Sequence, residues 1–147
     1  MLKIKVNKFK LPSCIDVVGC SVQNILSCLE DNYGSLREDV LFEIRVILNE
    51  LILNAVKHGN NEESDKYVKV VVGIFADDKV MLLVEDEGIG YNYKEVQEKN
   101  INSMLDIRFC NMEETGRGIM LVLNLCDRIK FSRRGNRITV IKKLYHP

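Results

Sequence analysis

The chain has 147 residues, of which 46% are hydrophobic and 29% charged, and its 21 basic residues balance its 21 acidic ones. This length and composition predict one domain over residues 1–147 with a substantial core, and the zero net charge gives no support for direct nucleic-acid binding. No apolar run approaches the roughly 20 residues that span a bilayer, and the N-terminus lacks a signal peptide's apolar stretch, so a cytoplasmic protein without membrane contact is expected.

The first third of the chain predicts one strand and one long helix before the central segment. Residues 2–9 alternate Leu2, Ile4 and Val6 with polar residues, which indicates a half-buried strand that ends near Pro12. Residues 15–29 carry apolar side chains at spacings of three and four, which predicts a helix ending at residues 32–34.

The central segment has the strongest helical pattern, over residues 37–58, with Gly59-Asn60-Asn61 as its predicted C-terminal stop. Residues 62–66 form a polar loop. Residues 67–76 and 80–85 are rich in β-branched side chains and predict a hairpin, followed by a turn at 86–90. Residues 91–115 are polar and weakly periodic, and so long an irregular segment is typical of a functional lid.

The last third predicts a helix over residues 119–126, opened by Gly116-Arg117-Gly118, and a hairpin of residues 128–131 and 137–143. The order β-α-α-β-β-lid-α-β-β groups helices and hairpins in separate blocks. It predicts an α+β fold, a two-layer sandwich whose mixed, mostly antiparallel sheet carries its helices on one face.

The five cysteines, at positions 14, 20, 28, 110 and 126, show no CxxC spacing. Free, buried thiols are the expected state. Neither His58 nor His146 lies near a cysteine pair, so no zinc site is predicted.

The first candidate site lies on the long helix, where Glu50 and Asn54 project about 40° apart and about 130° away from the apolar stripe. A carboxylate and an amide on one face can simply be solvated. The functional alternative is a glutamate that activates a hydroxyl or a water beside an asparagine that holds a metal.

The second candidate site is Asp86-Glu87-Gly88-Ile89-Gly90, directly after a predicted strand. A carboxylate at a strand end can accept a hydrogen bond from an adenine amino group, and glycines let the backbone approach a ligand closely. A tight turn after an edge strand explains the same residues without a ligand.

The third candidate site is the glycine-rich stretch at residues 114–121, ETGRGIML. A glycine-rich turn that opens a helix presents backbone N–H groups and the positive end of the helix dipole, which favour phosphate oxygens. An ordinary loop-to-helix turn is the alternative, and the stretch matches neither the Walker A pattern nor the protein-kinase glycine-rich loop.

Taken in order, a helix with E-x₃-N-A-x₂-H-G, a strand followed by D-x-G-x-G, a lid and then G-R-G on a helix resemble the N, G1 and G2 boxes of the GHKL ATPase superfamily. Residues 50–60 look most like the bacterial anti-sigma factor serine/threonine protein kinases, and residues 116–122 with Cys126-Asp127-Arg128 support that branch. The resemblance covers residues 3–144 and implies the histidine kinase-like (Bergerat) ATP-binding fold, with ATP and Mg²⁺ as cofactors.

The resemblance also assigns roles to single residues. It implies that Glu50 is the general base on a protein hydroxyl, that Asn54 coordinates Mg²⁺ and that Asp86 contacts the adenine amino group. The nucleotide-binding residues expected with them are Lys57, Gly88, Gly90, Thr115, Gly116, Arg117, Gly118 and Ile119.

Several side chains keep two interpretations. Lys57 and Arg117 could neutralise phosphates, but a surface position for Lys57 and a solvent-exposed or lid-clamping position for Arg117 explain them as well. His58 is expected to cap its helix rather than to accept a phosphoryl group. The basic stretch from residue 128 to 143 is either a solvated hairpin edge or a docking face for an acidic partner.

The function that the resemblance implies is an ATP-dependent kinase that phosphorylates a small anti-sigma antagonist protein, with the holding of a sigma factor as a further role. The alternatives are a binding module that ATP switches without phosphotransfer, and a detached ATP-binding domain that serves a separate phospho-acceptor histidine protein. A homodimer is the expected oligomer.

Overall fold

The computed structural model describes residues 3–88 and 114–144. In chain order the elements are β1 (Lys3–Pro12), the 3₁₀ turn η1 (Ile15–Val17), α1 (Val18–Tyr33), α2 (Glu38–Asn54), the π-helical turn η2 (Ala55–Gly59), β2 (Tyr67–Phe75), β3 (Lys79–Glu85), α4 (Glu114–Leu125), β4 (Arg128–Phe131) and β5 (Arg137–Lys143).

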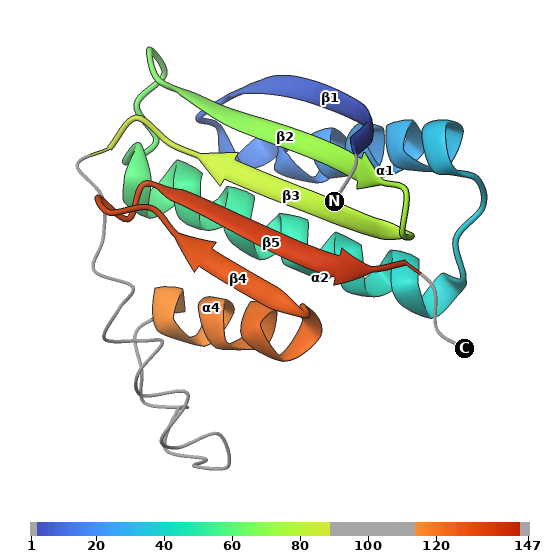
Figure 1. Ribbon diagram of the computed structural model, residues 1–147. Coiled ribbons are helices and arrows are strands. Elements are labelled where there is room, and N and C mark those ends of the chain that lie inside the picture. The colour runs from blue at the N-terminus through green and yellow to red at the C-terminus, as the bar shows by residue number, and fades with distance from the viewer. Residues whose placement is uncertain (1–2, 89–113, 145–147) are drawn as a thin grey trace, which may run out of the picture.

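The five described strands form one sheet in the order β1-β2-β3-β5-β4, and each described pairing is antiparallel. The helices α1, α2 and α4 lie on one face of this sheet (Figure 1). The predicted α+β sandwich with helices on one face is therefore confirmed.

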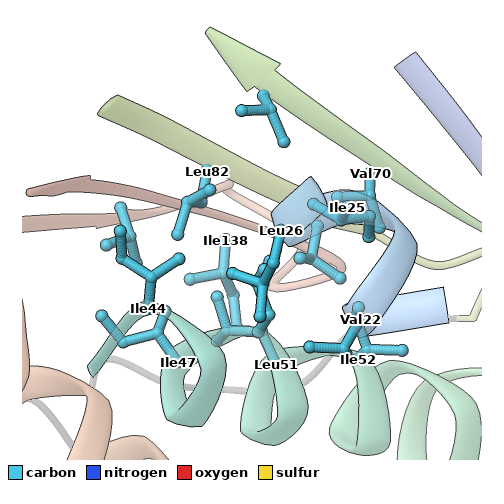
Figure 2. Close-up of a cluster of buried hydrophobic side chains, with 14 of the residues drawn as sticks. Val22, Ile25, Leu26, Ile44, Ile47, Leu51, Ile52, Val70, Leu82 and Ile138 are labelled. Carbon is cyan, nitrogen blue, oxygen red and sulfur yellow. The ribbon is translucent and has the colours of Figure 1, made fainter. Parts of the chain in front are cut away.

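The hydrophobic core fills the space between the sheet and the helices (Figure 2). Helix α2 lies in the middle and presents its apolar stripe to the sheet, while α1 and the sheet supply the facing side chains. The fully buried aliphatic residues include Val22, Ile25, Leu26, Ile44, Ile47, Leu51, Ile52 and Leu82. This periodicity of three and four is what fixes the rotation of α2, and so decides that Glu50 lies at the margin of the core.

Strand β1 differs from its prediction in the face it buries. It continues to Pro12, and Leu11 is its buried side chain, whereas Val6 is 44% exposed. The pairing with β2 shifts between Lys3 and Lys5. A one-residue irregularity exchanges the two faces of a strand, so the alternation predicts the wrong side for Val6.

Two helices also differ from prediction at their starts. Helix α1 begins at Val18, after the 3₁₀ turn η1, but it ends at Tyr33, within the predicted stop at residues 32–34, where Gly34 has a φ of 114°. Helix α4 begins at Glu114, five residues before the predicted start, so Gly118 lies inside the helix and not in a turn before it.

The cysteine prediction is wrong about burial, and Cys110 lies outside the described residues. The described cysteines are free thiols, but Cys14 and Cys20 are exposed, while Cys28 and Cys126 are half-buried. Cys126 packs against the hydrophobic core. None of the helices within the described residues is long and apolar enough to cross a membrane.

Candidate functional site

The end of α2 leads directly into the site through the π-helical turn η2. The backbone N–H of Asn60 donates to the carbonyl of Ala55 at 2.8 Å, five residues earlier, and Asn61 and Glu62 then take φ values of 51° and 57°. The helix therefore ends where predicted, but Gly59 is not a left-handed cap. Short π-helical turns inside helices occur frequently at functional sites.

Gly59 instead permits a close backbone approach. A Cβ at Gly59 would overlap the carboxylate of Asp86, and a Cβ at Gly88 would overlap the carbonyl oxygen of Gly59. The turn after α2 and the loop after β3 thus touch along their main chains. The first and second candidate motifs form one site, and only glycine at positions 59 and 88 leaves room for that contact.

Asn60 stabilises this junction between η2 and the loop after β3 by hydrogen bonds, although the sequence predicts for it only a place in a helix stop. Its side chain is fully buried; its Nδ2 donates to Ser13 Oγ at 2.8 Å and to the Tyr67 carbonyl at 3.0 Å, and its Oδ1 accepts from the backbone N–H of Glu87 at 2.8 Å. The backbone N–H of Tyr67 in turn donates to the Glu87 carboxylate. One amide therefore joins the ends of β1, η2 and β3 to the start of β2.

Asp86 is the carboxylate at the centre of this junction. Its Oδ1 accepts a hydrogen bond from the backbone N–H of Gly88 at 2.8 Å. Burial raises the pKa of Asp86 above the ordinary value, while the Gly88 N–H and the nearby Arg134 act to lower that pKa. A partly desolvated carboxylate of this kind is well suited to accept a hydrogen bond from a ligand amino group.

The β4–β5 turn supports the loop from its other side. Arg134 Nη2 donates to the Gly88 carbonyl at 2.6 Å, and the Asn136 main and side chains exchange hydrogen bonds with the Asp86 backbone at 2.9 and 3.1 Å. Gly135 between them has a φ of 79°. The sequence predicts only a hairpin turn for these residues, because no local pattern indicates that the turn reaches a loop nearly 50 positions earlier.

Helix α4 brings the third motif to the same site. Gly118 is buried, and a Cβ there would overlap Oε2 of Glu50 and come within 3.9 Å of Nδ2 of Asn54. Glu50 is half-buried, and Asn54 is 7% exposed. The residues proposed as general base and metal ligand, Glu50 and Asn54, therefore lie side by side where Gly118 of α4 packs on α2.

The environment of Asn54 fits a bound ion. Among the described residues, Asn54 Nδ2 is the buried side-chain polar atom that lacks a hydrogen-bond partner. The oxygen and nitrogen of an amide are exchangeable by a flip of the group, and a flip would put the oxygen on the unpartnered side. An amide oxygen is a suitable ligand for Mg²⁺, which otherwise binds phosphate oxygens and water.

The remaining candidates are placed as follows. Lys57 is half-buried in η2, Arg117 is exposed on α4, and Ile119 is fully buried in the core, so that only its backbone can reach a ligand. Thr115 and Gly116 lie in the first turn of α4, where backbone N–H groups have no acceptor within the helix. Gly90 and residues 91–113 of the expected lid lie outside the described residues.

Residues 21–142 match the family of histidine kinase-like ATPase domains. The chain is 32% identical over 93 residues to the anti-sigma F factor of Priestia megaterium, a match covering 63% of this chain and 60% of that protein. It is 26% identical over 138 residues to the serine-protein kinase RsbW of Bacillus velezensis, a match covering 93% of this chain and 84% of that protein.

The fold is also similar to that of the histidine kinase domain from the blue-light activated histidine kinase of Erythrobacter litoralis EL346. The TM-score is 0.52 at 16% identity, over 86% of this chain and 61% of that one. The chain thus matches about 60% of the length of the Priestia megaterium relative and of this structure. These matches confirm the superfamily and the fold expected from the three motifs.

Proposed function

The chain belongs to the family of histidine kinase-like ATPase domains, and we propose that it is an anti-sigma factor type kinase. It binds ATP with Mg²⁺ and transfers the γ-phosphoryl group to a serine or threonine of a small antagonist protein. Holding a sigma factor is the second part of the proposal. The names of two relatives, an anti-sigma F factor and a serine-protein kinase, support both parts.

One observation carries the proposal: three motifs from separate parts of the chain meet through glycine contacts. Gly59 and Gly88 close on Asp86, while Gly118 closes on Glu50 beside Asn54. At one end of the site a carboxylate can take the adenine amino group. At the other, helix N-terminal amides can receive phosphate oxygens next to a carboxylate that can take a proton.

In the proposed reaction, Glu50 accepts the proton of the acceptor hydroxyl as the hydroxyl oxygen attacks the γ-phosphorus. The bond from that phosphorus to the bridging oxygen breaks, and ADP leaves with the bonding electron pair. Phosphoryl transfer depends mainly on positioning and on neutralising the phosphate charge. Asn54 would hold the Mg²⁺, which supplies part of that neutralisation, and the first-turn amides of α4 supply another part.

The test is titration calorimetry of Mg-ATP into the wild-type chain and into Asp86→Asn. Replacing an acceptor carboxylate with an amide removes a hydrogen bond of the charge-assisted kind, so affinity is expected to fall about 10- to 100-fold. Asp65→Asn is the matched control because Asp65 is an exposed loop carboxylate. No ATP binding by wild type, or equal binding by both variants, would contradict the proposal.

A second measurement separates serine or threonine transfer from histidine transfer. The chain is incubated with labelled ATP and bacterial extract, and the labelled protein is treated with acid. Phosphoserine and phosphothreonine survive this treatment, whereas phosphohistidine does not. An acid-labile product would favour a detached ATP-binding domain that serves a histidine protein.

A further inference from the structure

Lys142 stands apart from the other cations of the basic C-terminal stretch. The arginines and lysines at positions 128, 130, 133, 134, 137 and 143 are exposed, whereas Lys142 is 3% exposed. Its side chain points from β5 toward the helices. Its Nζ lies 2.5 Å from Oε2 of Glu43 on α2 and donates to the carbonyl of Leu125 on α4 at 2.7 Å.

These partners give Lys142 a contact with both helices that carry the Glu50 and Gly118 pair. The Leu125 carbonyl belongs to the last turn of α4, where carbonyls find no N–H donor within the helix and the helix dipole is negative. A cation there is favourable for α4, and the Glu43 carboxylate balances its charge. Lys142 thus connects the end of α4 to the side of α2.

On each helix the same number of residues separates the Lys142 contact from the Gly118–Glu50 contact. Glu43 lies seven residues before Glu50 on α2, and Leu125 lies seven residues after Gly118 on α4, about 10.5 Å in each case. The helices run side by side in opposite directions (Figure 1). The Lys142 contact and the Gly118–Glu50 contact therefore mark the two ends of one helix–helix pairing, two turns apart.

Lys142 is the buried partner of this ion pair and Glu43 is half-buried, so the pair is a weak source of net stability, because desolvation of Lys142 offsets much of the attraction. The best-attested use of such a pair is to fix a register between packed elements. An aliphatic side chain at position 142 could fill the space, but it could hold neither the Glu43 carboxylate nor the Leu125 carbonyl at a set point. The contact therefore restricts α4 from sliding along α2.

We propose that Lys142 is a positioning residue that fixes the axial position of α4 on α2. It thereby holds Gly118 and the N-terminal amides of α4 over Glu50 and Asn54. This inference rests on the proposed function, since it takes the start of α4 to receive the phosphates of ATP. Lys142 itself touches neither nucleotide nor acceptor; it acts through α4.

The test compares Lys142→Met with Lys143→Met, its exposed neighbour on the same strand. Methionine keeps the length and volume of lysine, and Glu43→Gln provides a second variant that breaks the same ion pair while keeping its shape. Affinities for Mg-ATP and for adenosine are measured by calorimetry, and turnover is measured as ADP formation per folded molecule.

Lys142→Met is expected to lose about tenfold in ATP affinity and about tenfold in turnover, because the N-terminal amides of α4 would be displaced from their place over Glu50 and Asn54. Its adenosine affinity is expected to stay within about twofold of wild type, since Asp86 is held by other elements. Glu43→Gln should shift the same two quantities in the same direction, and Lys143→Met should change neither.

If Lys142→Met loses ATP and adenosine affinity equally, or loses neither, Lys142 is not a positioning residue. In that case ATP binding by wild type would still uphold the proposed function. If wild type binds no ATP, the proposed function fails and this inference fails with it. Should Lys142→Met not fold, the ratio of ATP to adenosine affinity in Glu43→Gln decides the question alone.

Discussion

The two ends of the site satisfy their polar groups in different ways. At the Asp86 end, which consists of Asp86, Gly88, Gly59 and Asn60, buried groups are joined by hydrogen bonds from four separate elements. At the Glu50 end, which consists of Glu50, Asn54 and Gly118, two helices meet by close packing, and Asn54 Nδ2 has no partner among the described residues.

Under the proposed function, this difference matches the part of Mg-ATP that each end would bind. A flat, neutral base is recognised by directed hydrogen bonds from a fixed frame, and the Asp86 end has its frame in place. Phosphates and a metal ion bring their own charges and ligands, so the Glu50 end can leave a buried amide unsatisfied until they bind. Variants at each end should therefore fail in different ways.

The largest expected effect is at the Glu50 end. Glu50→Gln keeps the size of the side chain but cannot accept the hydroxyl proton, so phosphotransfer should fall about 10²- to 10⁴-fold. ATP affinity should stay near the wild-type value, because the carboxylate is not assigned to nucleotide binding. Transfer and affinity are measured on the same preparation, with the exposed Glu62→Gln as control. Undiminished transfer would remove Glu50 from its proposed role as base.

At the Asp86 end the largest expected effect is a loss of stability, in Asn60→Ala. Asn60→Ala leaves Ser13 Oγ, the Tyr67 carbonyl and the Glu87 N–H without their buried partner. With a net cost of roughly 1 kcal/mol for each lost bond, the free energy of unfolding should drop by about 3 kcal/mol. Denaturant melting tests this against Asn24→Ala, an exposed position on α1 that should change little. A loss no larger than that of Asn24→Ala would mean that Asn60 does not fasten the junction.

Sequence reasoning succeeded where the information is local. The spacing of Leu48, Leu51 and Ala55 predicts which face of α2 is buried, and the turn residues predict the hairpins. It failed for Asn60, whose partners come from positions 13, 67 and 87, and for Lys142, which reads as one more cation of an exposed hairpin. Both are long-range pairings that only the folded chain creates.

The three glycine contacts were recovered only in part, for a related reason. Recognisable motifs point to Gly88 and Gly118, whereas the sequence around Gly59 predicts only a helix stop. A glycine needed for a positive φ and a glycine needed for close approach look identical in a sequence. Only the position of the Asp86 carboxylate against Gly59 tells them apart.

Gly59→Ala tests the rigidity of the Asp86 end. Its new Cβ would overlap a carboxylate held by Gly88, so the loop or η2 must move, with an expected loss of about 2 kcal/mol in stability. Nucleotide affinity should fall as well. Gly19→Ala is the matched control, because a Cβ there meets nothing within 4 Å, and alanine should stabilise α1 by up to about 1 kcal/mol. Equal melting temperatures for the two variants would contradict this account.

Gly118→Ala sharpens the contrast between the ends. Its Cβ would overlap Oε2 of Glu50, the far end of a side chain that can rotate away. Stability should therefore change by less than about 1 kcal/mol, since alanine also favours the helix. Phosphotransfer should still fall about tenfold, because the displaced carboxylate no longer faces the acceptor. A stability loss as large as that of Gly59→Ala would show that both ends are equally rigid.

The smallest expected effect concerns the charge on Asp86 itself. Its pKa in the folded chain is raised by burial above the ordinary value of 3.8, so the folded state keeps the proton to a higher pH than the unfolded state does. The stability that the folded chain has while Asp86 is protonated is fully present below pH 3.8. It is lost as the pH rises through the raised pKa, because the buried carboxylate must then ionise. Asp86→Asn carries no such charge, so it should melt at a higher temperature than wild type at pH 7, with the difference shrinking toward pH 3.

Melting curves from pH 3 to pH 8 test this, with Asp65→Asn as the exposed control whose difference from wild type should stay small throughout. At pH 7 the ATP affinity of Asp86→Asn should be lower than that of wild type, although its melting temperature is higher, because the ionised carboxylate is the better acceptor for an amino group. The variant that melts higher would then be the one that binds ATP poorly. A difference in melting temperature that does not vary with pH would show that the ionised Asp86 carboxylate carries no desolvation penalty in the folded chain.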